Sequence, residues 1–354
     1  MSSTITSSLD RYPYLIFTAG NQPPFGGIQT KTAHIFHALG LEKKKVVYSH
    51  GKRVENFFRD FGYGLKRRNI PTDLIKYFPR DGNIFIAEFD RDLFAVNEDN
   101  LKLDNITLSL VDTHYYNGAS EKIIEKMKSK WSFVAIRKTI ANFYEKKFGV
   151  KVECIPHIWY KFPIKPELKK YVDDISLKKG AIACCRLDFK KKVEIIFDAN
   201  DNLPPENICY VHGASTSRVY NYSILKLERL KKYWRGAFEK SFDKVSEIHA
   251  PAKFGVNLSD FPADGGGTEN TTLEYIYHNT AVILHRNWIK KGKEFSEGSE
   301  FEEGYNCFAV ESSEELAELL RKNPDTDSIV KEARKIIDNH TSNKLMNDWG
   351  RYVK

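Results

Sequence analysis

Short apolar runs alternate with amphipathic segments along the whole chain. In the first half, the apolar runs predict strands at 14–18, 46–49, 83–87, 106–111, 133–136 and 152–155. Between them, apolar residues at helical spacing predict helices, one that ends near Gly40 and another that ends at Gly149. Strands that alternate with helices form βαβ units around a parallel sheet. The first half therefore predicts a doubly wound α/β domain.

The same alternation resumes after a polar stretch that contains prolines. It predicts strands at 181–185, 208–212, 255–258, 281–284 and 307–310, and helices from Val193, over 225–242 and from Thr271. Ser312-x-x-Glu315 is a capping box that predicts a helix over 314–321. We therefore expect an N-terminal Rossmann-like domain (1–157), a linker (158–177), a C-terminal Rossmann-like domain (178–338) and a final helix (339–354) that can pack back on the first domain.

Two such domains joined by a linker predict a central cleft between them. Ligands of open parallel sheets bind beyond the carboxyl ends of the strands, so we expect both domains to face a ligand in this cleft. The formal net charge of +8 suits an anionic partner such as a nucleotide, DNA or an acidic membrane surface. The basic clusters at 43–45, 66–68 and 190–192 are each typical of a solvated face. No apolar run is long enough to span a bilayer, and the polar first ten residues do not resemble a secretory signal, so we expect a cytoplasmic protein.

Two loops after predicted strands carry candidate ligand-binding residues. The first contains Gly26 and Gly27 just before a helix, where the backbone can approach a ligand closely and offer N–H groups to an anion. A plain tight turn is the alternative. The second follows the first strand of the second half and contains Arg186 and Lys191, which could grip phosphate oxygens. A solvated basic loop is the alternative there.

The most informative segment runs from Asp264 through Gly265, Gly266 and Gly267 to Glu274. It combines three glycines with a helix start near Thr271, which is the pattern of an anion site at a helix N-terminus. Thr271-x-x-Glu274 also fits a capping box, in which Glu274 would be purely structural. The crowding of acids and glycines favours a ligand site.

Other candidates rest on single features. His114 follows a predicted strand and would face the cleft, although a lone histidine is as often structural. Asp90-Arg91-Asp92 fits a short metal-binding pattern that often arises by chance. The sequence contains no H-E-x-x-H, G-x-S-x-G or Walker-type motif, which argues against zinc hydrolases, serine hydrolases and P-loop enzymes.

Read in order, these elements resemble the family 4 retaining glycosyltransferases, which have the GT-B fold. Gly26-Gly27-Ile28-Gln29 is similar to that family's N-terminal glycine loop, and the stretch from Phe133 to His157 is similar to the segment that closes its first domain. Arg186-Leu187-x-x-x-Lys191 resembles its R-L-x-x-x-K motif, and the run from Leu273 to Ile283 resembles its L-E-A-x-x-x-G-x-P-V-I segment. Cys185, Lys192 and Asn279 stand where the family has glycine, and Ala281 where it has proline.

The resemblance implies transfer of a hexose or pentose from a UDP- or GDP-sugar, with retention of configuration and without an obligatory metal or other cofactor. Arg186 and Lys191 would stabilise the leaving diphosphate, and Asp264 would complete the catalytic set by holding the sugar. The remaining donor contacts would come from Gly265, Gly266, Gly267, Glu269, Thr271, Thr272 and Glu274. The family has a second acid ahead of the one that Glu274 matches, and here Asp264 and Glu269 both remain candidates for it. Gly26, Gly27 and His114 would lie on the acceptor side.

The sequence does not name the acceptor, which could be a glycan, a lipid-linked sugar or a protein glycan, and a peripheral membrane contact stays open. A second hypothesis is a DNA-modifying glucosyltransferase, because the resemblance extends loosely to phage DNA α-glucosyltransferases and the charge is positive. A third is an inactive nucleotide-binding scaffold, which the departures at Cys185, Lys192 and Asn279 keep open.

Overall fold

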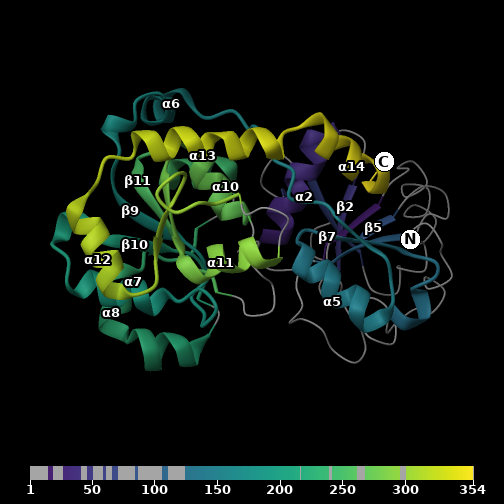
Figure 1. Cartoon of the computed structure of the whole chain (residues 1–354), viewed down its shortest axis with the longest axis horizontal. Coiled ribbons are helices and arrows are strands. Elements are labelled where there is room, and N and C mark those ends of the chain that lie inside the picture. Colours follow the sequence, from purple (N-terminus) through teal and green to yellow (C-terminus); the bar gives the residue numbers. More distant parts are fainter. Residues whose placement is uncertain are drawn as a thin grey trace. The chain divides into compact units, whose positions relative to one another are not determined.

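The computed structural model describes residues 15–18, 27–40, 46–50, 59–60, 66–70, 84–86, 106–110, 124–215, 217–238, 241–260, 268–295 and 300–353. The chain divides into two compact units. Unit 1 contains Met1–Tyr160 and His340–Lys354, and unit 2 contains Lys161–Asn339. Figure 1 labels the helices and strands of both units.

Unit 1 is built on one sheet whose described strands run in the order β3-β4-β2-β1-β5-β6-β7-β8. All neighbours are parallel except β3 and β4. The strands are β1 (Leu15–Thr18), β2 (Val46–His50), β3 (Arg59–Asp60), β4 (Lys66–Ile70), β5 (Ile84–Ile86), β6 (Ile106–Leu110), β7 (Ser132–Ala135) and β8 (Val152–Cys154). Every residue of β6 is buried, as expected for a strand covered on both faces.

Two helices of unit 1 lie where apolar residues recur at helical spacing, and each ends near a glycine. Helix α2 (Gly27–Ala38) connects β1 to β2, and α5 (Lys138–Phe148) connects β7 to β8. Helix α5 ends at Gly149, whose φ of 64° only glycine adopts at little cost and whose N–H donates to the Glu145 carbonyl at 2.9 Å. The predicted strands and both helix ends in this unit are thus confirmed to within a residue or two.

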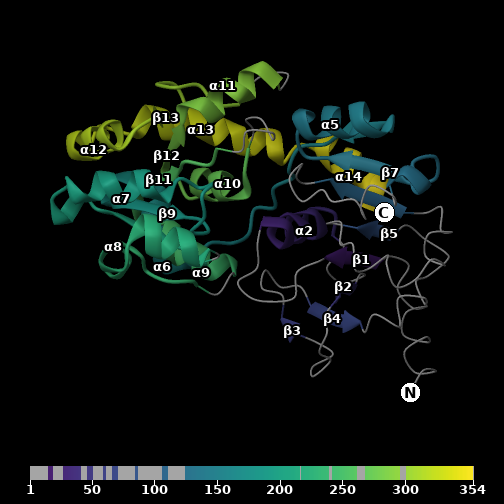
Figure 2. The ribbon, with the colours of Figure 1, turned by 90° about the horizontal axis from the view of Figure 1, so that it is seen from below.

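The last helix of the chain, α14 (Asn343–Val353), belongs to unit 1 and runs beside β5 (Figure 2). Its Trp349 is fully buried, and the indole N–H donates to the Pro156 carbonyl at 2.8 Å. The same ring meets Phe85 edge-on at 5.9 Å between centroids. The large apolar ring of Trp349, whose N–H is hydrogen-bonded, therefore holds α14 against the sheet.

Unit 2 contains a fully parallel sheet in the order β10-β9-β11-β12-β13. Its strands are β9 (Lys179–Cys184), β10 (Cys209–His212), β11 (Ala252–Asn257), β12 (Ala281–His285) and β13 (Phe308–Val310). The helices are α6 (Pro166–Asp173), η3 (Ile175–Leu177), α7 (Val193–Asp201), η4 (Pro205–Asn207), η5 (Tyr220–Leu225), α8 (Leu227–Tyr233), α9 (Phe242–His249), α10 (Asn270–Tyr277), α11 (Arg286–Phe295), α12 (Ser313–Lys322) and α13 (Asp327–His340), the last of which runs into unit 1.

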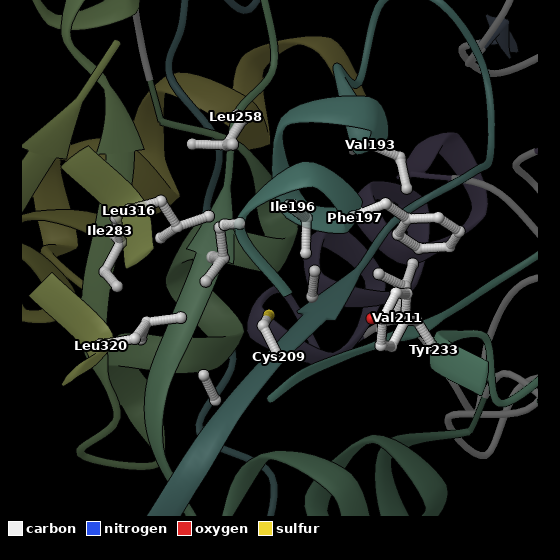
Figure 3. Packing of buried hydrophobic residues seen from close by; sticks show 14 of the residues in the cluster. Val193, Ile196, Phe197, Cys209, Val211, Tyr233, Leu258, Ile283, Leu316 and Leu320 are labelled. Atoms are coloured by element: carbon white, nitrogen blue, oxygen red, sulfur yellow. The ribbon is translucent and has the colours of Figure 1, made fainter. Parts of the chain in front are cut away.

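The core of unit 2 lies between this sheet and α7, α8 and α12 (Figure 3). Val193, Ile196 and Phe197 come from one face of α7 and meet side chains of β10 and α8. Leu316 and Leu320 of α12 complete the cluster beside Ile283. Helix α12 begins as predicted, because the Ser312 hydroxyl accepts from the Glu315 N–H at 3.3 Å.

Three local features of the two units differ from what the sequence predicts. The expected long helix over 225–242 is broken, since the chain leaves α8 at Trp234 and the Arg235 N–H donates to the Val211 carbonyl of β10 at 2.8 Å. Residues 66–70 form strand β4, which the sequence did not predict and which pairs with β2. The cluster at 190–192 is not simply a solvated face, because Lys191 pairs with Glu269 and Lys192 pairs with Asp260.

Candidate functional site

The loop after β9 places two cations at the carboxyl end of the unit 2 sheet. Leu187 is fully buried and forms a backbone bridge with Ser215, which fixes the loop to the body of the unit. Asp188 turns the chain, because its carboxylate accepts from the Lys190 N–H at 3.1 Å and its carbonyl from the Lys191 N–H at 3.1 Å. The Arg186 guanidinium contacts the Asp188 carboxylate at 3.3 Å and keeps 42% of its side chain exposed.

The neighbouring strand β11 leads to the start of helix α10, which Lys191 reaches directly. Glu269 is the N-cap residue of α10, and the Lys191 ammonium lies 3.1 Å from its carboxylate. Both side chains are 13% exposed, so the pair is largely shielded from water. Because β9 and β11 are adjacent and parallel, their carboxyl ends share one edge of the sheet. The predicted convergence of Lys191 with the first turn of α10 is therefore present.

Two residues at the end of β11 complete this contact, and neither was predicted from the sequence. The Asn257 amide donates to Glu269 at 2.9 Å and to the Thr272 hydroxyl at 3.1 Å. The Ser259 hydroxyl accepts from the Lys191 ammonium at 2.6 Å and donates to the Asn257 amide oxygen at 2.7 Å. Thr272 is thus turned inward to support the site. Polar residues directly after an apolar strand were the signal that could have found Asn257 and Ser259.

The charges of this region surround one thiol. Burial raises the pKa of Cys185 to about 12, and Lys191 and Arg186 lower it against the opposing effect of Asp188 and Glu269. The thiol is therefore neutral at ordinary pH and is a poor nucleophile.

A second ionic cluster adjoins the first. Asp260 accepts from the ammonium groups of Lys192 (2.9 Å) and Lys291, and the Asn287 amide donates to it at 3.2 Å. Burial alone would raise the pKa of Asp260, but the hydrogen bonds from Lys291 and Lys192 outweigh it and lower the value to about 2. His285 lies 3.4 Å from the Lys192 ammonium, and burial followed by this neighbouring charge lowers its pKa.

Two of the departures from the family pattern keep the backbone that glycine would give. Lys192 has a φ of 47° and Asn279 a φ of 57°, both in the left-handed region that glycine adopts most readily. Asn279 is stabilised there by its amide, which donates to the Val172 carbonyl at 2.8 Å. Lys192 and Asn279 therefore hold a backbone conformation that costs a residue with a side chain about 1 kcal/mol more than glycine.

Helix α10 carries the remaining donor candidates that the structure describes. It begins at Asn270, so Thr271 lies inside the first turn and is half-buried. Glu274 lies one turn further on and is 1% exposed. The capping-box alternative for Glu274 is wrong, because the N-cap residue is Glu269 and not Thr271.

Tyr275 locks α10 against the sheet and was also missed. Its hydroxyl accepts from the Cys184 N–H at 2.7 Å, at the last residue of β9. Its ring lies over Gly255 of β11 so closely that a Cβ there would be 2.4 Å from the ring. This close packing fixes the distance between the α10 start and the β9 loop.

Several predicted residues lie outside the described part of the chain, namely Gly26, His114, Asp264, Gly265, Gly266, Gly267 and the Asp90-Arg91-Asp92 pattern. Gly27 is the first residue of α2. Among the residues that the structure does describe, no three His, Cys, Asp or Glu side chains gather as a metal site would require. The helices in these same ranges are all too short or too polar to cross a membrane.

Comparison with known proteins identifies the fold. No protein-family model matches the chain, and no curated protein matches its sequence. HepE from Anabaena, in complex with UDP and glucose, has a TM-score of 0.68 at 12% identity, with 95% of this chain and 97% of that chain covered. Sucrose-phosphate synthase from Thermosynechococcus elongatus has a TM-score of 0.66 at 12% identity, covering 96% and 98%. A glycosyltransferase from Rickettsia africae has a TM-score of 0.64 at 14% identity, covering 98% and 99%.

These proteins are GT-B glycosyltransferases. The chain has the GT-B fold. The similarity extends over nearly the whole chain. Identities this low show the fold alone, so membership of family 4 and the likeness to phage DNA enzymes stay predictions.

Proposed function

We propose that the chain transfers a sugar from a UDP- or GDP-sugar to a glycan, lipid-linked or protein-glycan acceptor, with retention of configuration and without an obligatory metal. The observation that carries the proposal is the approach of Lys191 to the start of α10, at the carboxyl ends of two adjacent parallel strands. The comparisons support it, because HepE has been crystallised with UDP-glucose and shares this fold.

The chemistry that such a site offers is stabilisation of a leaving diphosphate. As the bond from the sugar to the diphosphate breaks, negative charge grows on the phosphate oxygens. Lys191 and Arg186 would supply positive charge, and the first-turn N–H groups of α10 would supply oriented donors. The Arg186 side chain is 42% exposed, so a ligand could reach its guanidinium from solvent.

Three residues have supporting roles in the proposal. Asn257 and Ser259 hold the Lys191 ammonium and the Glu269 carboxylate in one geometry, which reduces the reorganisation needed when the diphosphate binds. Glu269 is the acid that we favour for the sugar hydroxyls, since it is fixed beside Lys191 at the start of the helix. Asp264 remains the alternative.

Glu274 has the position of a ribose-binding acid in the family pattern. We propose that it accepts hydrogen bonds from the ribose hydroxyls, with Thr271 beside it in the same helix. Gly26, Gly27 and His114 keep their proposed place on the acceptor side.

A thermal-shift screen of the full chain against nucleotide-sugars tests the proposal. A ligand present at a hundred times its Kd adds about 2.7 kcal/mol to the free energy of unfolding, which raises Tm measurably. We expect a rise with at least one UDP- or GDP-sugar, followed by slow release of free sugar from that compound. Unchanged Tm with every UDP- and GDP-sugar at millimolar concentration would contradict the proposal.

A further inference from the structure

The surface of unit 2 carries a group of large apolar side chains that face solvent. We call it the η5 patch. It consists of Phe189 (56% exposed), Val219 (68%), Tyr222 (62%), Ile224 (41%) and Leu227 (44%). Single exposed apolar residues are common on soluble proteins, but a cluster drawn from one short segment and the loop beside it marks an interaction surface.

The fold holds these side chains outward. The segment Tyr220–Leu225 forms one turn of π-helix, a rare structure that recurs at functional sites. Tyr220 and Leu225 are fully buried and pin both ends of the turn, and the Tyr220 hydroxyl donates to the Glu194 carboxylate. The residues between these two anchors therefore cannot all turn inward, and Tyr222 and Ile224 face solvent.

Phe189 joins the patch through a direct ring contact. Its ring lies 4.7 Å from the ring of Tyr220, centroid to centroid, at an interplanar angle of 58°. Phe189 belongs to the loop after β9 that also carries Arg186 and Lys191. The patch is therefore continuous with the loop of the candidate site.

The border of the patch carries three exposed cations, and the exposed carboxylate of Glu228 lies beside Leu227. Arg218 and Lys226 flank the π-helix turn, and both are exposed. Lys231 is exposed one turn after Leu227 on α8, so it lies on the same helix face. Within the described residues none of these three cations forms an ion pair. The neighbouring Arg229, in contrast, is paired with Asp198 and Asp201.

We propose that the η5 patch rests on a lipid bilayer that contains anionic headgroups. Apolar and aromatic side chains can enter the boundary between headgroups and acyl chains, while the three cations contact the negative surface around them. A second copy of the chain fits less well, since a two-fold contact through this patch would bring the same cations together. Binding to a bilayer would hold the β9 loop near the membrane surface, and it does not depend on the function proposed above.

Vesicle flotation with the full chain tests this inference. The chain should float with vesicles made of equal parts phosphatidylcholine and phosphatidylglycerol, and not with vesicles of phosphatidylcholine alone. High salt should release it, because the Debye length falls from about 10 Å at 0.1 M to about 3 Å at 1 M. The double variant Ile224→Ser/Leu227→Ser should bind the mixed vesicles at least about tenfold more weakly.

Matched controls separate the patch from general effects of a surface change. Leu177→Ser removes a leucine of the same exposure (44%) from η3, outside the patch, and should bind like the unchanged chain. Charge reversal in Arg218→Glu/Lys231→Glu keeps every apolar side chain and should also abolish flotation, which covers the case in which the serine variant folds poorly. Urea unfolding curves of all variants check that each is folded.

Three results would each overturn the inference. One is equal flotation with neutral and anionic vesicles, and another is equal binding by the patch variants and Leu177→Ser. The third is a dimer seen by analytical ultracentrifugation that Ile224→Ser/Leu227→Ser dissociates, since the patch would then be an interface between copies.

Discussion

Replacing Lys191 with methionine removes the positive charge at the start of α10 while keeping a long side chain. Its ammonium lies 3.1 Å from the Glu269 carboxylate and 2.6 Å from the Ser259 hydroxyl. At an effective dielectric constant of about 20, a charge pair at this distance has a gross attraction of about 5 kcal/mol. Desolvation of both groups offsets most of it.

Two different losses should follow from this one change. Glu269 would keep the Asn257 donor but lose its counter-ion, so the free energy of unfolding should fall by about 1–3 kcal/mol. The transition state for sugar transfer should lose about 2–4 kcal/mol if Lys191 contacts the leaving diphosphate. That range corresponds to a rate reduction of roughly thirtyfold to a thousandfold.

A double variant separates the two losses. Lys191→Met/Glu269→Gln removes the uncompensated carboxylate, so stability should return toward the unchanged chain while the rate stays low. Glu269→Gln alone measures how much of the rate loss comes from the proposed sugar contact of Glu269, and the double variant should be slower than this single variant. The assay is single-turnover hydrolysis of whichever nucleotide-sugar the screen identifies, alongside urea unfolding. Lys179→Met is the matched control, because Lys179 lies at the opposite end of the same strand and is exposed.

Either of two results would contradict a contact between Lys191 and the leaving diphosphate. If the single-turnover rate of Lys191→Met is within about threefold of the rate of the unchanged chain, Lys191 does not contact the diphosphate in the transition state. A rate that recovers together with stability in the double variant would show that Lys191 is only structural.

Two further predictions concern stability. Burial lowers the pKa of Lys178 from 10.5 to about 7, and the unfolded chain holds this proton up to higher pH, so the free energy of unfolding should rise between pH 7 and 10. Lys178→Met should lack that rise when the free energy of unfolding is measured in urea at each pH. If the variant and the unchanged chain show the same pH dependence, Lys178 is not the group responsible. Gly255→Ala should lower the free energy of unfolding by about 1–3 kcal/mol, because the new methyl group meets the Tyr275 ring. Adding Tyr275→Leu should recover part of that loss, and strictly additive effects would show that the two positions do not interact.

Most strands could be predicted from the sequence because buried parallel strands are short, continuous apolar runs. β6 and β12 are of this kind, with every residue buried. Strand β4 was missed because it begins Lys66-Arg67-Arg68, and its pairing with β2 does not depend on apolar side chains. The helix expected over 225–242 failed because pairing of the chain with Val211 outweighs the local helical pattern.

The candidate site was predictable only in outline. The order of motifs indicated Lys191 and the start of α10, and their contact follows from two adjacent parallel strands. Asn257, Ser259 and Asp260 were missed because single polar residues after a strand have no distinctive spacing, and only the register of β9 against β11 shows that they converge. The roles of all these residues stay predictions.

Calorimetric titration of the full chain with nucleotides measures whether this site binds a diphosphate. The affinities of UDP, GDP and ADP are each compared with the affinity of the corresponding monophosphate, so that the test does not depend on knowing the base. The account predicts that one diphosphate binds at least about tenfold more tightly than its monophosphate, and that Lys191→Met removes most of this difference while Lys179→Met does not. Equal affinities for the diphosphate and monophosphate, or a difference that Lys191→Met leaves intact, would contradict it.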